Sequence, residues 1–469
     1  MSVTTTAEAP QRIEDNTIQP IPASERHGKS RDLFTIWFGS NIMLLTVVNG
    51  ALATTVYGQP FWLAVLGLVI GNLVGAVFMA LHSAQGPRLG VPQMMQTRGQ
   101  FGSYGSLLVI VLVVLMYVGF FASNLVLAGQ SLNVISSHVS VDAGIVVVGA
   151  VSMVVTIFGY DLIHAYARLM TYAAGAALLL TFIWIVAVHH LGHNFGTTGK
   201  ASITGFMGTI TIAALWQIAY APYVSDYSRY MRADTGARPA FWASYTGCSL
   251  GSILPMILGA IIGIESSDVV TGLATLTRGI SVLVIVVFTI CIAMTNSMNI
   301  YGGALSMIAI GQTFRVNWLP KARARAVLTA VIFVAAVVPA IVSQNNFLTN
   351  YSNFVLLLMY VLVPWTSINL VDFYLVRHGD YDVGQFFRAD GGIYGRFNWV
   401  AIGCYLLGIA IEAPFVNTTM FEGPIAKSLG GVDVSWIVCL IVISPLYYVI
   451  ASRRRAVVPA PEPAEVAAG

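Results

Sequence analysis

The chain has 469 residues, of which 57% are hydrophobic and only 9% are charged, and its formal net charge is +3. Soluble domains carry roughly a quarter charged residues, so this composition, with a mean hydropathy of +0.78, indicates a membrane protein. The small net charge, without a basic run containing interleaved aromatics, argues against a nucleic-acid partner.

Charged residues are absent from long windows of the chain, and these windows predict its helices. A spanning helix needs roughly 20 apolar residues, so several windows hold two spans separated by a short turn. An all-α polytopic membrane protein with twelve transmembrane helices is therefore expected. The predicted spans are about 34–56, 61–83, 103–129, 142–160, 165–190, 204–224, 240–263, 280–311, 326–342, 353–376, 398–416 and 433–451.

Two polar segments flank this membrane domain, which is expected over residues 31–452. Residues 1–30 mix both charge signs and lack an apolar signal-peptide core, so they are predicted to be a disordered cytoplasmic tail. Residues 453–469 are predicted to be a second cytoplasmic tail. With the N-terminus inside, the outer segments hold only Lys200, Arg278 and Lys427 of the 23 Lys and Arg residues. The positive-inside rule then places both termini in the cytoplasm, and a multi-pass protein of the plasma membrane is expected.

Motifs for catalysis or cofactors are scarce. The sequence has no HExxH, GxSxG or Walker A motif, so neither an enzyme nor an ATP-driven pump is expected, and no cofactor is predicted. The four cysteines lie inside predicted spans and are interpreted as packing residues. The cluster His189, His190 and His193 suits zinc by spacing, but no carboxylate lies nearby in sequence, and its role stays open.

Two predicted helices contain residues that interrupt a helix. The first reads WFGSNIMLLTVVNGALATT, and the sixth continues into LWQIAYAPYVSDYSRYMR, from Leu215 to Arg232. Interrupted backbone at membrane depth is tolerated only where it faces protein or a watery cavity. Interruptions at matching places in two halves indicate an inverted-repeat transporter. The repeats would span about 34–190 and 204–376, followed by two extra helices over about 398–451.

Polar and aromatic side chains gather at one depth of helices that carry no charge there. Helix eight has Thr295, Asn296, Ser297 and Asn299 within five residues, and helix three repeats aromatics at helical spacing up to Asn124. Interhelical hydrogen bonding and core packing are the alternative interpretations. Because an unpaired charge in the membrane is expensive, an uncharged cluster of this kind favours a neutral, planar, hydrogen-bonding solute such as a nucleobase.

Four segments resemble a known family: GPRLGVPQMMQTRGQFGSYG (86–105), YVSDYSRYMR (223–232), MTNSMNIYGGALS (294–306) and VPWTSINLVDFYLVRHGDY (363–381). They are similar to the nucleobase:cation symporter-1 family, in particular its purine–cytosine permease branch, from about Arg31 to Arg453. The resemblance implies the leucine-transporter-like fold of the amino acid–polyamine–cation superfamily, with five-plus-five inverted repeats and two extra C-terminal helices. It also implies import of cytosine or purines by cation symport with alternating access.

The resemblance further implies which residues bind the solute and the coupling cation. Matched by motif, the substrate-binding residues would be Phe120, Asn124, Trp216, Gln217, Ala219, Asn296 and Asn299. The cation-binding residues would be Gly39, Ile42, Cys291 and Thr295. A second hydroxyl is expected where Met294 stands, and a thioether is a poor ligand for sodium, so proton coupling is favoured while sodium stays open.

Alternatives remain at this point. The same fold is compatible with allantoin, hydantoin or another small neutral heterocycle. A non-transporting membrane sensor or a channel would belong to a different class. A channel needs a continuous polar stripe, whereas the polar residues here cluster at one depth, and neither tail is large enough for a signalling domain. A monomer in the lipid bilayer is expected.

Overall fold

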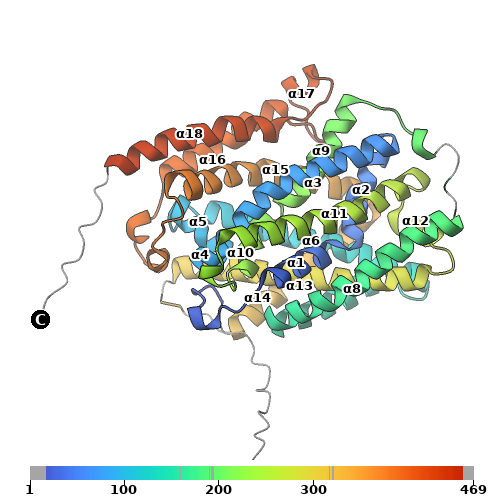
Figure 1. The fold of residues 1–469 in the computed structure, drawn as a ribbon, viewed down its shortest axis with the longest axis horizontal. Coiled ribbons are helices and arrows are strands. Elements are labelled where there is room, and N and C mark those ends of the chain that lie inside the picture. The colour runs from blue at the N-terminus through green and yellow to red at the C-terminus, as the bar shows by residue number, and fades with distance from the viewer. Residues whose placement is uncertain are drawn as a thin grey trace, which may run out of the picture.

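The computed structural model describes residues 17–457 except Gly159, His190, 192–194, Val316 and 319–321. Its helices run mostly along the long axis of the molecule (Figure 1). They are α1 Ser30–Asn41, α2 Leu44–Thr55, α3 Phe61–Ser83, α4 Gly86–Leu89, α5 Gln93–Phe101, α6 Leu107–Ile135, α7 Val141–Phe158, α8 Tyr160–Trp184, α9 Ile203–Ile218, α10 Ala221–Ser228, α11 Ala237–Glu265, α12 Val269–Leu276, α13 Ser281–Phe314, α14 Ala322–Ser343, α15 Phe347–Val371, α16 Trp399–Glu412, α17 Pro424–Ser428 and α18 Ser435–Val457.

Among the described residues, nine helices are long and apolar enough to cross a membrane, or ten if the bent pair α1 and α2 is one span. One of the nine stretches, Arg323–Val376, contains both α14 and α15, and the apolar helix at Trp399–Phe415 is shorter than the rest. Every one of the twelve predicted windows contains a helix. The all-α membrane architecture is therefore confirmed, while the number of twelve crossings stays a prediction.

The two ends of the bundle differ in what they carry. The N-terminal segment (residues 17–29), α4, α5 and the end of α18 gather at the left end in Figure 1, and we name this end the N-terminal face. The start of α12 and the short turn η5 (Gln344–Asn346) mark the other end, the opposite face. Both ends of the described chain thus lie on the same face of the bundle.

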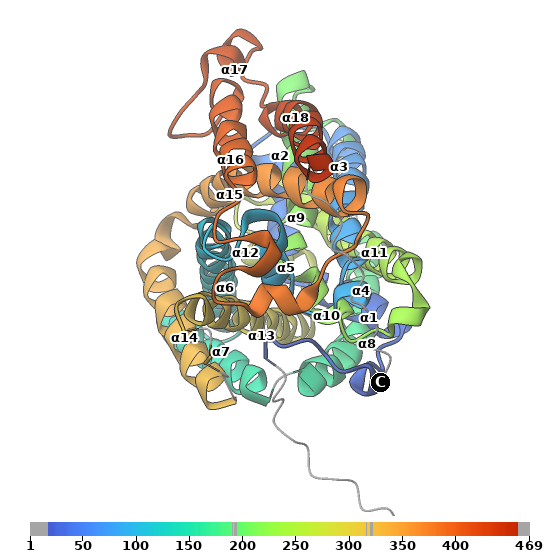
Figure 2. The same ribbon diagram turned by 90° about the vertical axis from the view of Figure 1, so that its left-hand side faces the viewer.

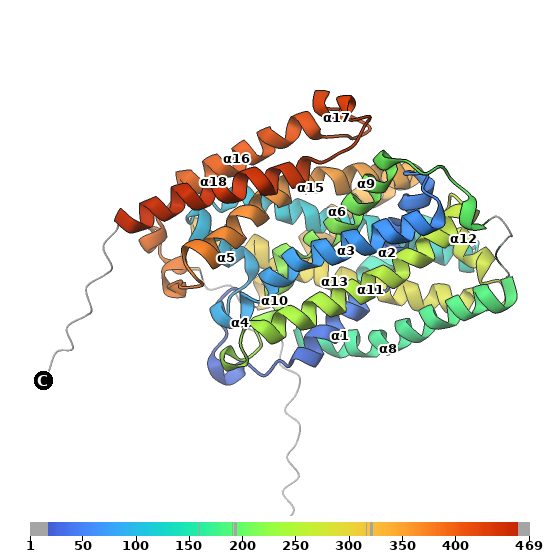
Figure 3. The ribbon, with the colours of Figure 1, turned by 45° about the horizontal axis from the view of Figure 1, so that its top comes forward.

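The last two long helices lie outside the main bundle. In Figures 2 and 3, α16 and α18 run side by side along one flank, and both contact α15. The interior instead contains α2 and the middle of α13, where nearly every side chain is buried, together with the buried faces of α6 and α9. The central site is formed by these interior helices.

A break divides the first span. The axes of α1 and α2 differ by 58°, and Met43 has an extended conformation between them. The sixth span is interrupted more gently, at Ala219 and Tyr220. Pro222 lies at the start of α10 and lacks the amide hydrogen that would bond four residues back, to Ile218. Both interruptions fall in the helices for which the sequence predicted them.

Glycines bring the interior helices into close contact. Gly67, Gly71 and Gly75, spaced four apart on α3, face α9, and a Cβ atom at Gly71 or Gly75 would overlap the α9 backbone. Small residues allow such close approach in lipid, where packing drives association. This glycine ladder therefore packs helices within the chain.

The N-terminal segment is packed where the sequence predicted a disordered tail up to residue 30. Ile18 and Ile21 are fully buried, and the amide of Ile21 donates to the carbonyl of Gly90 at 3.0 Å. The amide of Gly28 donates to the carbonyl of Tyr230 at 2.9 Å. Burial of these two isoleucines stabilises the packed segment, because it removes apolar surface from water. The prediction of disorder used only the mixed charge signs of residues 1–30 and did not consider this burial. The described part of the predicted tail thus covers the N-terminal face.

A buried arginine joins three elements at this face. Arg98 on α5 is 3% exposed and donates to Gln312 Oε1 and the carbonyl of Phe386 through one nitrogen. Its other terminal nitrogen donates to the carbonyl of Ala309 and to Thr313 Oγ1. Burial lowers the pKa of Arg98 to about 10, so the guanidinium remains charged at neutral pH. The positive charge lies where the last turn of α13 directs its carbonyl dipoles, which stabilises it.

We expect Arg98→Gln to destabilise the protein, because it leaves several buried acceptors without a donor, at a cost of about 1–3 kcal/mol. The measurement is the apparent melting temperature of the detergent-purified protein. Arg232→Gln is the matched control, because Arg232 and its partner Asp234 are 66% and 64% exposed and such pairs contribute little. Equal melting temperatures for the two variants would contradict this role of Arg98.

Candidate functional site

A small central cavity lies beside both helix interruptions. Its lining residues are Met43, Phe120, Asn124, Trp216, Ala219, Tyr220, Tyr223, Thr295 and Asn299. They come from the α1–α2 break, α6, the α9–α10 segment and α13. The cavity volume is about 10 Å³, the room that one water molecule needs, so the site is closed in this structure. None of the lining side chains carries a charge at neutral pH.

Aromatic rings form one wall of the cavity. The centroids of Phe120 and Trp216 are 6.1 Å apart with their planes at 87°, and Phe354 lies edge-on to Phe120 at 5.2 Å. Tyr220 follows at 5.8 Å from Trp216, and Tyr223 at 5.5 Å from Tyr220. Edge-to-face rings at these separations are favourable. The cavity thus has rings from α6 and from both α9 and α10 around one space.

Two buried amides at this depth have no hydrogen-bond partner. Both side-chain polar atoms of Asn124 and both of Asn296 are unpaired, and each residue is fully buried. Buried amides are almost always paired, because an unpaired one costs about 1–3 kcal/mol. An amide without a partner in the protein is a candidate for contact with a ligand or an ordered water molecule.

The packing of α6 against α13 brings these two amides to the same level. The start of α6 and the end of α13 both lie near α5, so the helices are antiparallel. Gly303 packs against Tyr117, and from this contact Asn296 and Asn124 are each seven residues away, or about 10 Å. Seven residues is close to two full turns, so both amides stay on the facing sides. Asn124 lines the cavity, and Asn296 lies beside that wall without being one of its lining residues.

The other predicted solute contacts divide between the cavity and its surroundings. Ala219 and Asn299 line the cavity together with Phe120 and Trp216. Gln217 does not line it: its Nε2 donates to Asn72 Oδ1 at 2.7 Å and to Ser252 Oγ at 3.0 Å. In this closed state Gln217 therefore links α9 to α3 and α11 instead of contacting the cavity.

The predicted cation ligands lie around the α1–α2 break. The hydroxyl of Thr295 donates to the carbonyl of Ser40 at 2.8 Å, and the amide of Ile42 donates to the carbonyl of Gly39 at 3.2 Å. Cys291 and Met294 are fully buried beside them. A hydrogen bond from α13 thus occupies a carbonyl at the break, and the neighbouring side chains offer sulfur, which binds hard cations poorly.

The sequence left open the role of the cluster His189, His190 and His193. Among the described residues, no group of three His, Cys, Asp or Glu side chains is close enough to hold a metal ion. His189 lies in a π-helical turn at the end of α8, while His190 and His193 are outside the described residues.

Sequence reasoning missed three lining residues: Met43, Tyr220 and Tyr223. A signal for the tyrosines was present, because Trp216, Tyr220 and Tyr223 follow at spacings of four and three, which place them on one helical face. Met43 had no such signal, because its side chain reaches the cavity only through the extended backbone at the break.

Comparison with known proteins shows the family of this chain. Residues 20–439 match the family model described as permease for cytosine/purines, uracil, thiamine, allantoin. A protein of Bacillus subtilis (strain 168), provisionally named a purine–cytosine permease, is 39% identical over 94% of this chain and 97% of its own length. The purine–cytosine permease of Emericella nidulans is 24% identical, over 90% of this chain and 85% of its own.

The fold is shared with a solved transporter. Mhp1, a nucleobase-cation-symport-1 family transporter, in a closed conformation with bromovinylhydantoin bound, matches with a TM-score of 0.77 and 19% identity, over 95% of this chain and 96% of its own. The inward-facing form of Mhp1 matches with a TM-score of 0.71, covering 95% and 94% of the two chains. The present structure is thus closer to the closed form than to the inward-facing form.

We expect Asn124→Leu to raise the apparent melting temperature of the purified protein, because it removes an unpaired buried amide and keeps a similar volume. Asn72→Leu is the matched control. The Asn72 amide donates to the carbonyl of Leu68 at 2.8 Å and accepts from Gln217, so its loss should lower the melting temperature. A lower melting temperature for Asn124→Leu would show that Asn124 is bonded in the folded protein.

Proposed function

The chain belongs to the permease family for cytosine/purines, uracil, thiamine and allantoin, and we propose that it imports a neutral nucleobase, cytosine or a purine, by cation symport with alternating access. It is a multi-span membrane permease and not an enzyme. Family membership and the clustering of polar residues at one depth favour a transporter over a membrane sensor or a channel.

The orientation follows from charge. Both ends of the described chain lie at the N-terminal face, which also carries Arg26, Arg88, Arg98 and Arg229. Cytoplasmic segments of membrane proteins carry an excess of Lys and Arg. We therefore place the N-terminal face in the cytoplasm and the opposite face outside, in the plasma membrane.

The observation that supports this function most strongly is the uncharged cavity with unpaired amides. Phe120 and Trp216 supply faces on which a flat ring can stack, and Asn124 and Asn299 supply donors and acceptors for its edge. Asn296 lies within reach once the wall moves to admit a ring. Ala219 leaves space because it has only a methyl group. A charged solute would lack a counter-charge here.

The pattern of helix contacts supports the five-plus-five inverted repeat. The second predicted span, α3, packs on α9 of the sixth, and the seventh, α11, packs on α1 and α2 of the first. The third span, α6, packs on the eighth, α13. Exchanging the two halves maps these contacts onto one another, as a pseudo-two-fold axis requires. Alternating access would then move one repeat relative to the other around the central cavity.

Hydantoin or allantoin is the second candidate solute. The solved relative Mhp1 binds bromovinylhydantoin in the same fold, and a five-membered ring with imide groups presents donors and acceptors similar to those of a pyrimidine. The amides of the cavity do not by themselves distinguish these rings. An uptake assay in which nucleobases compete with hydantoin or allantoin distinguishes the two candidate solutes.

We expect radiolabelled cytosine to be taken up by permease-deficient cells that express the protein, and unlabelled adenine or hypoxanthine to compete better than allantoin or hydantoin. Asn124→Leu should reduce uptake at least about tenfold at equal expression, since the hydrogen bonds to the solute are lost. Asn133→Leu is the matched control on the same helix, because its amide bonds the carbonyl of Val139 away from the cavity. Absence of cytosine uptake together with uptake of radiolabelled hydantoin would replace the nucleobase proposal with the second candidate.

We propose proton coupling, because Thr295 already donates to the Ser40 carbonyl and Met294 offers no oxygen. Uptake should therefore persist when choline replaces sodium and fall to background when a protonophore is added. A strict sodium requirement would contradict proton coupling and leave the nucleobase proposal intact.

A further inference from the structure

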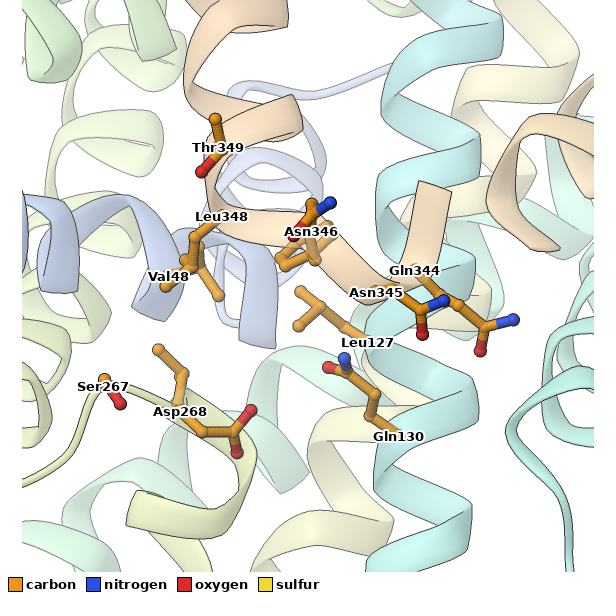
Figure 4. A pocket seen from close by; sticks show the side chains of 12 residues that line it. Val48, Leu127, Gln130, Ser267, Asp268, Gln344, Asn345, Asn346, Leu348 and Thr349 are labelled. Atoms are coloured by element: carbon orange, nitrogen blue, oxygen red, sulfur yellow. The ribbon is translucent and has the colours of Figure 1, made fainter. Parts of the chain in front are cut away.

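A second cavity, of about 230 Å³, lies at the opposite face of the bundle. Its walls come from the end of α6, the start of α12 and the turn η5 between α14 and α15 (Figure 4). Val48 of α2 and Leu127 of α6 contribute to its lining and are themselves buried. We name it the outer cavity.

The outer cavity shares two walls with the central one. On α6, Asn124 lines the central cavity, whereas Leu127 and Gln130 line the outer one. Each step of three residues turns the position by about 60° around the helix, so Leu127 lies between Asn124 and Gln130, and Gln130 is about 9 Å along the axis from Asn124. The second shared wall is the broken first span, where Met43 lines the central cavity and Val48 the outer one. A solute that enters from outside therefore reaches the outer cavity first.

Several amide side chains that line the outer cavity make no hydrogen bond to the described protein. Among the described residues, the side chains of Gln130, Asn345 and Asn346 have no hydrogen-bond partner in the protein, and Figure 4 shows the Gln130 and Asn346 side chains around the open space. Gln344 differs, because it donates to Asp142 Oδ1 and to the carbonyl of Ile341, both at 2.8 Å. Three amides thus remain available to a solute as donors and acceptors.

One carboxylate adds a preference that amides lack. Asp268 caps α12, with Oδ1 accepting from the amide of Thr271 at 2.7 Å, and Figure 4 shows its carboxylate directed towards the space beside Gln130. An ionised carboxylate only accepts hydrogen bonds, and bonds to it are stronger than those between neutral groups. It therefore favours an exocyclic amino group and disfavours an edge on which a ring N–H lies beside a carbonyl oxygen.

We propose that the outer cavity is a docking site for the solute, in which Asp268 selects neutral heterocycles that carry an amino group. This inference rests on the proposed import of nucleobases and names the substrate class that the entrance prefers. The cavity is smaller than the roughly 300–1,000 Å³ of pockets for drug-sized ligands, as suits a single small heterocycle. Because Asp268 is solvent-exposed, its hydrogen bond adds only modestly to the affinity for the solute. This bond affects the binding of the solute at the outer cavity, before the central site opens.

The test compares uptake of cytosine, which has an amino group, with uptake of hypoxanthine, which has none. Asp268→Asn should raise the KM for cytosine about three- to tenfold and leave the maximal rate and the KM for hypoxanthine unchanged. Asparagine caps helices as well as aspartate, so α12 should stay intact. Glu265→Gln is the matched control, because it removes an exposed carboxylate three residues earlier, outside the cavity lining.

The outcomes separate this inference from the proposed function. Absence of uptake of both bases by the unsubstituted protein would overturn both. Normal uptake of both bases with no change in Asp268→Asn would overturn only the outer docking site. An equal rise in KM for both bases, or the same rise in Glu265→Gln, would show a general effect of surface charge and would also overturn it.

Discussion

The carboxamide of Asn41 joins α1 to α9 and α11 beside the central cavity. At the end of α1 its oxygen accepts from Trp216 Nε1 at 2.8 Å and from Ser252 Oγ at 2.9 Å, while its nitrogen donates to the carbonyl of Trp37 at 2.7 Å. Backbone that leaves a helix at membrane depth must find partners inside the protein. A neutral amide supplies them without burying a charge, so the first span is interrupted and the site beside it stays uncharged.

The pairing state of buried amides distinguishes scaffold from site. Gln217 Nε2 donates to Asn72 Oδ1 and to Ser252 Oγ, and Asn72 Nδ2 donates to the carbonyl of Leu68, so these bonds hold α9, α3 and α11 together. Asn124 and Asn296 are equally buried, yet their amides have no partner in the protein, which costs stability in this closed structure. Such a cost is retained where function requires it, because the ordinary outcome of folding is to pair or replace these groups. The same residue type therefore has opposite roles within one layer of the membrane.

The sequence predicted the helices well, because the absence of charge over roughly 20 residues is a direct consequence of the lipid environment. Helix α3 has the predicted bounds, 61–83, whereas α1 begins four residues early, at Ser30, because Asp32 caps its amide end by accepting from Lys29. Residues that line the cavity were predictable where the type of side chain determines the position, as for the ring of Phe120. The orientation of Gln217 could not be predicted from the sequence. It depends on how α9 is rotated against α3, and the spacing of residues within one helix does not determine this rotation.

The barriers on the two sides of the central cavity differ in physical kind. Towards the N-terminal face, one turn beyond Tyr223, the carboxylate of Asp226 accepts from the amide of Gln93 at 2.9 Å, and Arg229 donates to the carbonyl of Thr17 at 3.0 Å. Towards the opposite face, the shared walls place apolar side chains such as Leu127 between the central and outer cavities. Hydrogen bonds that involve a charged group are directional and are lost once their partners separate, whereas apolar contacts tolerate sliding. Under the proposed alternating access, a small displacement of helices would open the cavity more readily towards the opposite face, while opening towards the N-terminal face would require the charged groups to find new partners.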